Sequence, residues 1–457
     1  MAQKPSIPKG TRDFSPLEVQ RRQYIMNIIR KHFELFGFMP IETPSFENYG
    51  TLMGKYGDEG DRLIFKILNS GEYLKKADPK VLEDKNEQKL TPSISEKALK
   101  YDLTVPFARY VVQHQNEINF PFKRYQMQNV YRADRPQKGR FREFTQCDAD
   151  VVGSDSLLQE VELIQLYDNV FNDLGIQGAT IKINNRKILA GIAQMIGASD
   201  KLIDFTVALD KLDKIGQEKV KQEMLEKGIS NDAVEALTPI FSLSGSYDDK
   251  LATMKELLKD SAEGLKGIEE LEFIQNLLKD YNFKSVTLDL DITLARGLNY
   301  YTGCIFEVAA PQGVKMGSIA AGGRYDDLTG IFGLKDVSGV GISFGLDRIY
   351  LVMEQLELFP DTVRAGVDVL FINFGEREAA YCVGWLSRFR ESGIKTELYP
   401  ESAKMKKQMT YADRNEIPYV ILAGENEIAD GKLNLKNMRT GEQQQLTPED
   451  IITKLTD

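Results

Sequence analysis

The chain has 457 residues and a formal net charge of −10, and it is 42% hydrophobic and 28% charged. This length allows about three domains at roughly 150 residues each, and the composition excludes a disordered or fibrous protein. No apolar run approaches the ~18 residues that span a bilayer, and the start MAQKPSIPKG lacks the apolar core of a signal peptide. We therefore expect a cytoplasmic protein with no membrane partner.

Histidine and cysteine are scarce, with two and three residues respectively in the whole chain. The cysteines are far apart and none lies in a CxxC pair, which argues against a disulfide set or a structural zinc site. Two histidines, most simply read as structural, argue against a Ser-His-Asp relay or a His-rich metal centre. Any chemistry should therefore rest on arginines and carboxylates, and the sequence identifies no metal ligands.

The first predicted element is an amphipathic helix. Ser15 and Glu18 have capping-box spacing, an apolar face follows, and Gly37 ends the helix. Pro40 and Pro44 then mark an extended stretch that cannot be a central strand.

Residues 121–152 predict a β-hairpin with an unusual charge. The twenty residues from Lys123 to Arg142 carry seven basic side chains and one acidic side chain. By the period of two, Arg124, Gln126 and Gln128 share one face of the first strand, and Gln146, Asp148 and Asp150 share one face of the return strand. The turn falls at RPQKG, where Gly139 allows a positive φ. We interpret the hairpin as the floor of a polar pocket.

Residues 185–281 have helical apolar spacing and many Lys/Glu pairs, so we predict a helical insertion there. Strand patterns resume at SVTLDLDIT. After a linker near Pro360, strand and helix patterns alternate, which predicts a small α/β domain with a largely parallel sheet.

Four further segments contribute polar groups. In KYDLTVPFARY, Asp102 and Thr104 should share a face of an extended strand, and taken alone this segment is more typical of a solvated strand end. LARGLNYYTG (residues 294–303) is either a ligand-binding loop or a turn with packed aromatic rings, and AAGGRYDDLTG could be no more than a bulge. GVGISFGLDRIY imitates a dinucleotide fingerprint with the wrong spacing, so we reject that reading and keep a strand leading into a helix with Arg348 in its first turn.

These groups together indicate a polar pocket for phosphoryl or nucleotidyl transfer to or from a cationic small molecule. Arginines hold phosphates, carboxylates hold an ammonium group, and tyrosines bind a polar ring. The pocket residues expected from this reasoning are Asp102, Arg132, Asp150, Arg296, Tyr300, Tyr301 and Arg348.

In this order and spacing, the segments resemble the class II aminoacyl-tRNA synthetases, and among them the histidyl-tRNA synthetase family. VYRADRPQKGRFREFTQCDAD resembles the second motif of the class, GVGISFGLDRIYLV the third, and TPSFEN with the preceding helix the first. LARGLNYYTG is similar to the histidine-specific signature. The resemblance implies an α+β fold, with a catalytic domain of antiparallel sheet and flanking helices, a helical insertion, and a C-terminal α/β anticodon-binding domain. The implied domains are 1–184 and 282–358 (catalytic), 185–281 (insertion) and 366–457 (anticodon-binding).

The resemblance also implies that ATP, with Mg²⁺ on its phosphates, reacts with L-histidine and that the product is passed to tRNA(His). Arg132 would hold the α-phosphate and the substrate carboxylate, while Arg296 would stabilise charge on the α-phosphate. Phe144 would stack on adenine, and Arg140 and Arg348 would complete the ATP site.

The resemblance assigns the remaining residues to the binding of histidine and tRNA. The implied histidine-binding residues are Asp102, Thr104 and Gln146 for the amino group, Asp150, Tyr300 and Tyr301 for the imidazole, and Arg132 for the carboxylate, together with Arg296. The loop residues implied to meet the tRNA acceptor end are Arg135, Gln137 and Lys138. The first motif of the class forms a dimer interface, which implies a homodimer.

Two alternatives from other classes stay open. One is a non-catalytic synthetase paralogue that regulates ATP phosphoribosyltransferase; such chains usually lack the C-terminal domain and the catalytic arginines. The other is the synthetase-like sensor module of a protein kinase, although the sequence contains no kinase domain.

Overall fold

The computed structural model describes residues 4–295 and 300–456. The chain divides into two compact units, the first built from residues 21–360 with the residues before 14, and the second from residues 361–456, with which residues 14–20 are grouped. In the described part of the chain, no helix combines the length and the apolar character that a bilayer crossing requires.

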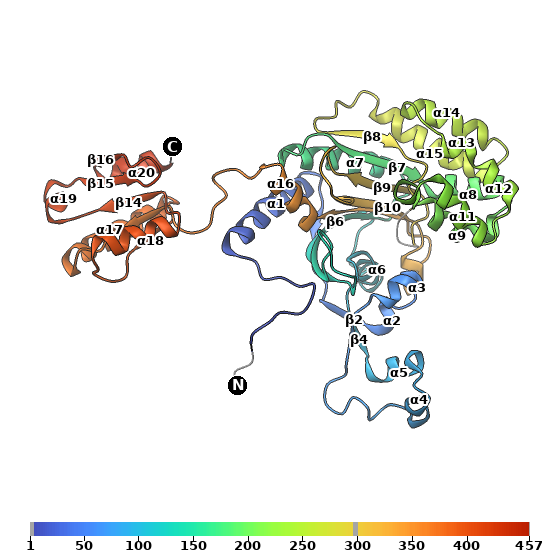
Figure 1. Cartoon of the computed structure of the whole chain (residues 1–457), viewed down its shortest axis with the longest axis horizontal. Coiled ribbons are helices and arrows are strands. Elements are labelled where there is room, and N and C mark those ends of the chain that lie inside the picture. The colour runs from blue at the N-terminus through green and yellow to red at the C-terminus, as the bar shows by residue number, and fades with distance from the viewer. Residues whose placement is uncertain (1–3, 296–299, 457) are drawn as a thin grey trace. The chain divides into compact units, whose positions relative to one another are not determined.

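A mixed sheet forms the centre of the first unit (Figure 1). Among the described residues it has eight strands, in the order β1-β5-β6-β11-β10-β9-β7-β8. Its strands are β1 (Met39–Pro40), β5 (Phe122–Tyr131), β6 (Glu143–Val152), β7 (Ala179–Asn185), β8 (Val286–Leu290), β9 (Cys304–Ala309), β10 (Ala320–Tyr325) and β11 (Gly339–Gly345). The central pairs are antiparallel as expected, whereas the two outermost pairs, β1 with β5 and β7 with β8, are parallel.

The predicted hairpin is the pair β5 and β6. Its register places Arg124 opposite Asp150, and Gln126 opposite Asp148. The alternation of a pleated strand therefore gathers these polar side chains on one face. The predicted polar floor is confirmed, and so is the positive φ of +73° at Gly139 in the turn.

Helices cover the opposite, apolar face of this sheet. Helix α1 (Pro16–Leu35) begins as predicted, because the Ser15 N–H donates to Glu18 Oε2 at 2.7 Å and the Glu18 N–H donates to Ser15 Oγ at 3.4 Å. Phe33 of α1 packs against Phe344 of β11 with ring centroids 5.9 Å apart. Tyr167 of α7 (Leu158–Asp173) meets the same ring at 5.1 Å. Helix α16 (Leu346–Gln355) follows β11 directly.

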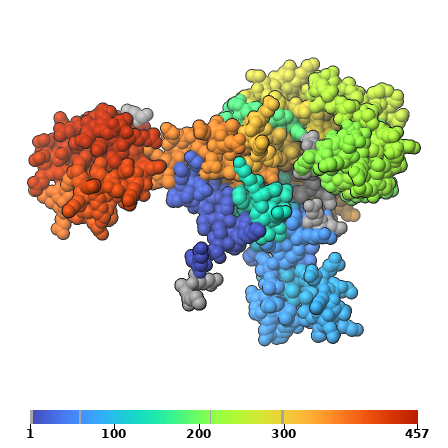
Figure 2. Space-filling model, in the orientation of Figure 1, coloured from blue at the N-terminus to red at the C-terminus, as the bar shows by residue number. Residues whose placement is uncertain are grey.

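Residues 186–278 are helical, as the sequence indicates. The elements are α8 (Arg186–Met195), η1 (Ser199–Lys201), α9 (Leu202–Leu209), α10 (Leu212–Ile215), α11 (Gln217–Glu226), α12 (Asn231–Ala236), α13 (Thr238–Phe241), α14 (Tyr247–Leu257) and α15 (Ala262–Leu278). They form the crossover that the parallel pair β7 and β8 requires, and Figure 2 shows them in green at one end of the first unit. The limits 185 and 281 of an insertion domain stay predictions.

A smaller subdomain lies below the sheet in Figure 1. Its elements are β2 (Phe46–Asn48), α2 (Tyr49–Leu52), α3 (Gly57–Arg62), β3 (Lys66–Ile67), α4 (Pro79–Glu83), α5 (Glu87–Ile94), β4 (Lys97–Leu99) and α6 (Thr104–Gln113). The strand predicted for Asp102 and Thr104 is wrong, because Thr104 opens helix α6. Asp102 Oδ1 accepts the backbone N–H of Val105 at 3.2 Å, which satisfies one of the free donors at the helix start.

The second unit is the predicted α/β domain. Its sheet has the order β13-β12-β14-β15-β16 within the described residues. The elements are β12 (Val369–Phe371), α17 (Glu376–Glu391), β13 (Thr396–Leu398), α18 (Met405–Arg414), β14 (Tyr419–Leu422), α19 (Glu425–Asp430), β15 (Leu433–Asn437), β16 (Gln443–Leu446) and α20 (Pro448–Thr456). Strands β12, β13 and β14 are parallel, and the unpredicted pair β15 and β16 adds an antiparallel edge.

Candidate active site

Two adjoining cavities lie on the polar face of the central sheet. The larger, of about 330 Å³, is lined by residues that include Arg132, Arg140, Phe144 and Arg348. The smaller, of about 40 Å³, is lined by three carboxylates and three tyrosines: Asp102, Asp148, Asp150, Tyr300, Tyr301 and Tyr325. Both cavities are bounded by Gln146, Tyr301 and Ser343, so these residues form a shared wall.

The larger cavity brings together the cationic residues predicted for a phosphate site. The Arg132 guanidinium lies 4.3 Å from the centroid of the Tyr101 ring and 5.2 Å from that of Phe144. Arg348 donates to the backbone oxygen of Gly139 at 3.0 Å and of Ser318 at 2.5 Å, which ties the first turn of α16 to the hairpin loop. Burial lowers the pKa of Arg348, and the neighbouring Arg140 acts in the same direction. A phosphate group would relieve this repulsion.

The loop of the hairpin projects its polar side chains outward. Arg135, Gln137, Lys138 and Arg140 are exposed, and the backbones of Gln137 and Arg140 pair with each other. Arg140 also lies 3.7 Å from Asp134, between Nη1 and Oδ1. The loop therefore offers an exposed basic surface at the mouth of the larger cavity.

Asp102 lines the smaller cavity with 1% of its surface exposed. Its carboxylate accepts hydrogen bonds from Tyr56 Oη at 2.8 Å and from Tyr300 Oη at 3.0 Å. Burial raises the pKa of Asp102, and these hydrogen bonds oppose the rise. Thr104 lines the same cavity from the start of α6.

Asp150 lines the cavity too, but its carboxylate is already paired. Arg124 Nη2 lies 2.8 Å from Asp150 Oδ2, and the Arg124 side chain is completely buried. Tyr325 Oη donates to Asp150 Oδ1 at 2.7 Å. Burial raises the pKa of Asp150, while Arg124 opposes the rise. Sequence reasoning missed Arg124 as the counter-charge of Asp150, although the two residues face each other in the hairpin register.

Asp148 was predicted to lie on the polar face of the hairpin but was left out of the expected substrate-binding residues. It is 2% exposed, and burial raises the pKa of its carboxyl group to about 7, with Asp150 contributing in the same direction. Gln146, on the same strand, donates to Ser343 Oγ at 2.9 Å. The period-two pattern that placed Gln146 and Asp150 in the pocket also places Asp148 there.

The signature segment runs from Leu294 to Gly303, and Arg296 with residues 297–299 lies outside the described residues. Arg186, the first residue of α8, contacts both described ends of the segment. Its backbone N–H donates to Gly303 O at 2.9 Å, and its Nη1 donates to Ala295 O at 3.1 Å. Tyr300 and Tyr301 stand together, with ring centroids 5.1 Å apart.

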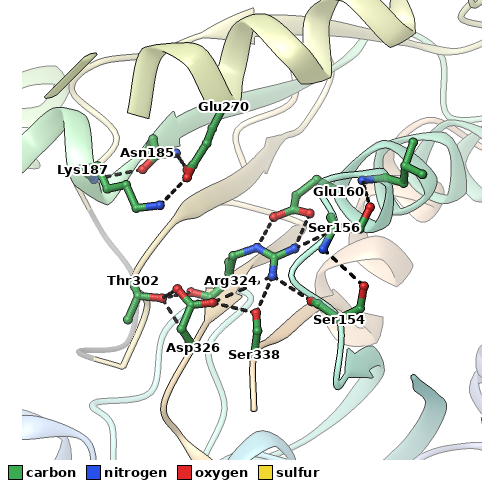
Figure 3. Close-up of polar contacts among 11 residues, drawn as sticks. Ser154, Ser156, Glu160, Asn185, Lys187, Glu270, Thr302, Arg324, Asp326 and Ser338 are labelled. Carbon is green, nitrogen blue, oxygen red and sulfur yellow. Dashed lines mark hydrogen bonds and ion pairs between the residues drawn. The ribbon is translucent and has the colours of Figure 1, made fainter. Parts of the chain in front are cut away.

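A buried ion pair anchors the C-terminal end of the signature segment (Figure 3). Arg324 meets both carboxylate oxygens of Glu160 at 2.5 and 2.7 Å, and its Nη1 donates to Ser338 Oγ at 2.5 Å. The Arg324 carbonyl accepts the Thr302 N–H at 2.8 Å, and Thr302 Oγ1 donates to Asp326 Oδ2 at 2.6 Å. Sequence reasoning treated Arg324 only as part of a glycine-rich stretch and missed this role.

The site can hold a phosphorylated group and a small cationic group side by side. Arginines line one cavity and carboxylates the other, and both cavities share the lining residues Gln146, Tyr301 and Ser343. Fixed charges of this kind can align a carboxylate with a phosphate and stabilise the charge that develops between them. Within the described residues, no group of three or more His, Cys, Asp and Glu side chains could hold a metal ion.

Two family models match the chain, the histidyl-tRNA synthetase model over residues 82–349 and the anticodon-binding domain model over residues 368–457. A histidine–tRNA ligase of Christiangramia forsetii is 70% identical over 446 residues, which cover 98% of each chain. A histidine–tRNA ligase of Bacteroides fragilis is 60% identical and covers 100% of both chains. The crystal structure of a histidyl-tRNA synthetase from Nostoc superposes with a TM-score of 0.82 at 30% identity, covering 99% of each chain. The fold and the family expected from the sequence are thereby confirmed: the chain belongs to the histidyl-tRNA synthetase family.

Proposed function

We propose that the chain is a histidine–tRNA ligase that works in two steps at the paired cavities. L-Histidine and ATP form histidyl-adenylate and pyrophosphate, and the terminal ribose of tRNA(His) then takes the histidyl group. The observation that carries this proposal is the shared wall of Gln146, Tyr301 and Ser343 between an arginine-lined and a carboxylate-lined cavity. Because the two cavities adjoin at these residues, the carboxylate of an amino acid in one cavity can reach the α-phosphate of ATP in the other.

We assign ATP to the larger cavity. Arg132 would bind the α-phosphate and the histidine carboxylate, and Phe144 would stack on adenine. Arg348 would cover the other side of adenine and reach the γ-phosphate, with Arg140 assisting from the loop. Mg²⁺ would arrive with ATP as the counter-ion of its phosphates, and hence as part of the substrate.

We assign histidine to the smaller cavity. Arg296 would stabilise the negative charge on the α-phosphate as the carboxylate attacks, a role inferred from the signature alone. The residues that would hold the amino group are Asp102, Thr104 and Gln146, and those facing the imidazole are Asp150, Tyr300 and Tyr301.

The same proposal covers the partners of the chain. The exposed loop residues Arg135, Gln137 and Lys138 would meet the acceptor end of tRNA, and the second unit would bind the anticodon. We also propose a homodimer that acts in the cytoplasm, which sedimentation of an active sample at micromolar concentration would test. A monomer mass there would contradict the dimer.

A non-catalytic regulator of ATP phosphoribosyltransferase is the weaker alternative. Such a chain would need neither Arg132 and Arg348 in a cavity nor a segment that matches the anticodon-binding model over residues 368–457. The kinase-sensor alternative has no further support, because the two family models match the chain from residue 82 to residue 457, with only residues 350–367 between them.

The decisive experiment is ATP–pyrophosphate exchange with each of the twenty amino acids, followed by charging of tRNA(His). Exchange should depend on histidine and be lost in Arg132→Gln. A matched control is Arg30→Gln, because Arg30 is exposed on α1, where it contacts Asn27 at 2.8 Å and the Tyr125 hydroxyl, and it lines neither cavity. Exchange with another amino acid, or none in a folded wild-type sample, would overturn the proposal.

A further inference from the structure

The smaller cavity contains three buried carboxylates, and two of them have strong partners inside the protein. Asp102 accepts two tyrosine hydroxyls and a backbone N–H. Asp150 has the buried Arg124 guanidinium and the Tyr325 hydroxyl. The hydroxyl and N–H donors therefore occupy the Asp102 carboxylate, and the Arg124 guanidinium compensates the charge of Asp150 before a substrate enters.

Asp148 differs from both. Asp150 Oδ2 also lacks a hydrogen bond from the described residues, but it lies 2.8 Å from Arg124 Nη2, and no such ion pair is found for Asp148 within the described residues. The Asp148 Oδ1 atom is buried, and among the described residues this atom has no hydrogen-bond partner. The Asp148 carboxyl group does form a side-chain hydrogen bond with Ser343 on the neighbouring strand β11. A buried acceptor without a donor is unfavourable, and such atoms in native proteins often await a ligand.

The place of Asp148 on the strand points its carboxyl group toward the substrate site. Gln146, Asp148 and Asp150 alternate on one face of β6, and all three line the smaller cavity. The Gln146 Oε1 atom is likewise buried without a partner in the described part of the chain. Two neighbouring unsatisfied acceptors therefore face a space that must receive hydrogen-bond donors.

We propose that Asp148 is a specificity-determining residue that accepts a hydrogen bond from a ring N–H of bound histidine. The inference rests on the proposed function and adds a residue to its site. A carboxylate accepts hydrogen bonds only, whereas the imidazole carries an N–H on one ring nitrogen or on both. Asp148 would thus recognise the ring, while Asp150 stays fixed by Arg124 and shapes the wall beside it.

The electrostatics of the pocket agree with this assignment. The charged groups that act on Asp148 are Arg124, Asp150 and Asp102, and the burial of its own carboxyl group raises its pKa to about 7. An N–H donor or an imidazolium ion beside Oδ1 would offset this desolvation. A substrate ring without a donor would leave the Asp148 acceptor unpaired and should be rejected.

The test is the Michaelis constant for histidine and for ATP in the exchange assay, for wild type and D148N. Losing a hydrogen bond to a charged group should raise the histidine constant about tenfold to a hundredfold, with the ATP constant within about twofold. D148N should also discriminate less between histidine and 4-thiazolylalanine, whose ring nitrogen carries no proton at neutral pH. A purely structural role would not change this selectivity.

The controls separate the outcomes. D289N makes the same substitution on β8, at the far edge of the sheet, where Asp289 pairs with Lys250, and should leave both constants unchanged. If D148N does not fold, the same constants and selectivity can be measured with D148S. A folded variant with an unchanged histidine constant and selectivity would overturn the role of Asp148, whereas a wild-type chain without histidine-dependent exchange would overturn the proposed function itself.

Discussion

Replacing Arg324 by Met should lower the free energy of unfolding of the first unit by about 3–5 kcal/mol, the usual cost of removing one partner of a buried ion pair. Arg324 is 4% exposed and Glu160 is 0% exposed. The variant would leave the Glu160 carboxylate buried without its counter-charge, and would remove the donor to Ser338 and to the carbonyl groups of Ser154 and Ser156. The unpaired charge dominates, because each neutral hydrogen bond contributes only about 1 kcal/mol.

Urea unfolding followed by two signals provides the assay. The chain has one tryptophan, and this residue, Trp385, lies in α17 of the second unit. Its fluorescence therefore reports on the second unit, whereas far-UV circular dichroism reports on both. The dichroism transition of Arg324→Met should shift to lower urea, and the fluorescence transition should stay in place.

The double variant Arg324→Met/Glu160→Met tests the physical reason. Replacing both partners by apolar side chains removes the uncompensated charge, so most of the lost stability should return. The reasoning is refuted if Arg324→Met unfolds at the wild-type urea concentration. It is also refuted if the double variant is less stable than the single variant, since packing or the serine contacts would then outweigh the charge.

Three further outcomes are expected. Deleting residues 361–457 should preserve histidine-dependent pyrophosphate exchange and strongly reduce tRNA charging, as measured on the same folded sample. Arg296→Ala should nearly abolish exchange, at about 2.7–4 kcal/mol for one preorganised charge, while histidine binding by calorimetry persists. For Asp148 the folded pKa of about 7 exceeds the unfolded value of 3.8, so its protonation stabilises the folded chain at low pH, and this contribution is lost as pH rises toward 7. The stability of Asp148→Asn relative to wild type should therefore increase between pH 5 and pH 7 in urea titrations and level off above it.

The parts of the fold that the sequence predicted are those with local causes. The capping box at Ser15 and Glu18 involves neighbours along the chain, and strand alternation assigns Gln146 and Asp150 to one face without knowledge of any other strand. The strand predicted for Asp102 was wrong because the sequence DLTVP is compatible with either an extended strand or the start of a helix. The choice depends on Tyr56 and Tyr300, which bind its carboxylate from 46 and 198 residues away in the chain.

The candidate site was less predictable where residue pairs decide the chemistry. A sequence pattern such as QCDAD shows which side chains share a face of the strand. It does not show which carboxylate forms an ion pair inside the folded protein. That distinction between Asp148 and Asp150 depends on Arg124, which lies on the opposite strand and is completely buried. Arg324 escaped notice for the same reason, because its partner Glu160 belongs to a helix 164 residues earlier.

The glycines that imitated a dinucleotide fingerprint are required by side chains of the site. A Cβ atom at Gly341 would lie 2.0 Å from Asp150 Oδ1, and one at Gly339 would lie 2.3 Å from the Tyr325 ring. Because Tyr325 in turn donates to Asp150, both glycines make room for one buried hydrogen-bonded group. A Cβ at Gly323, on the neighbouring strand β10, would lie 2.8 Å from the Tyr301 ring. The glycines of two adjacent strands therefore leave space for side chains that line the smaller cavity, and not for a pyrophosphate close to the backbone. The spacing of glycines along one strand cannot reveal this packing, because it depends on side chains from other strands.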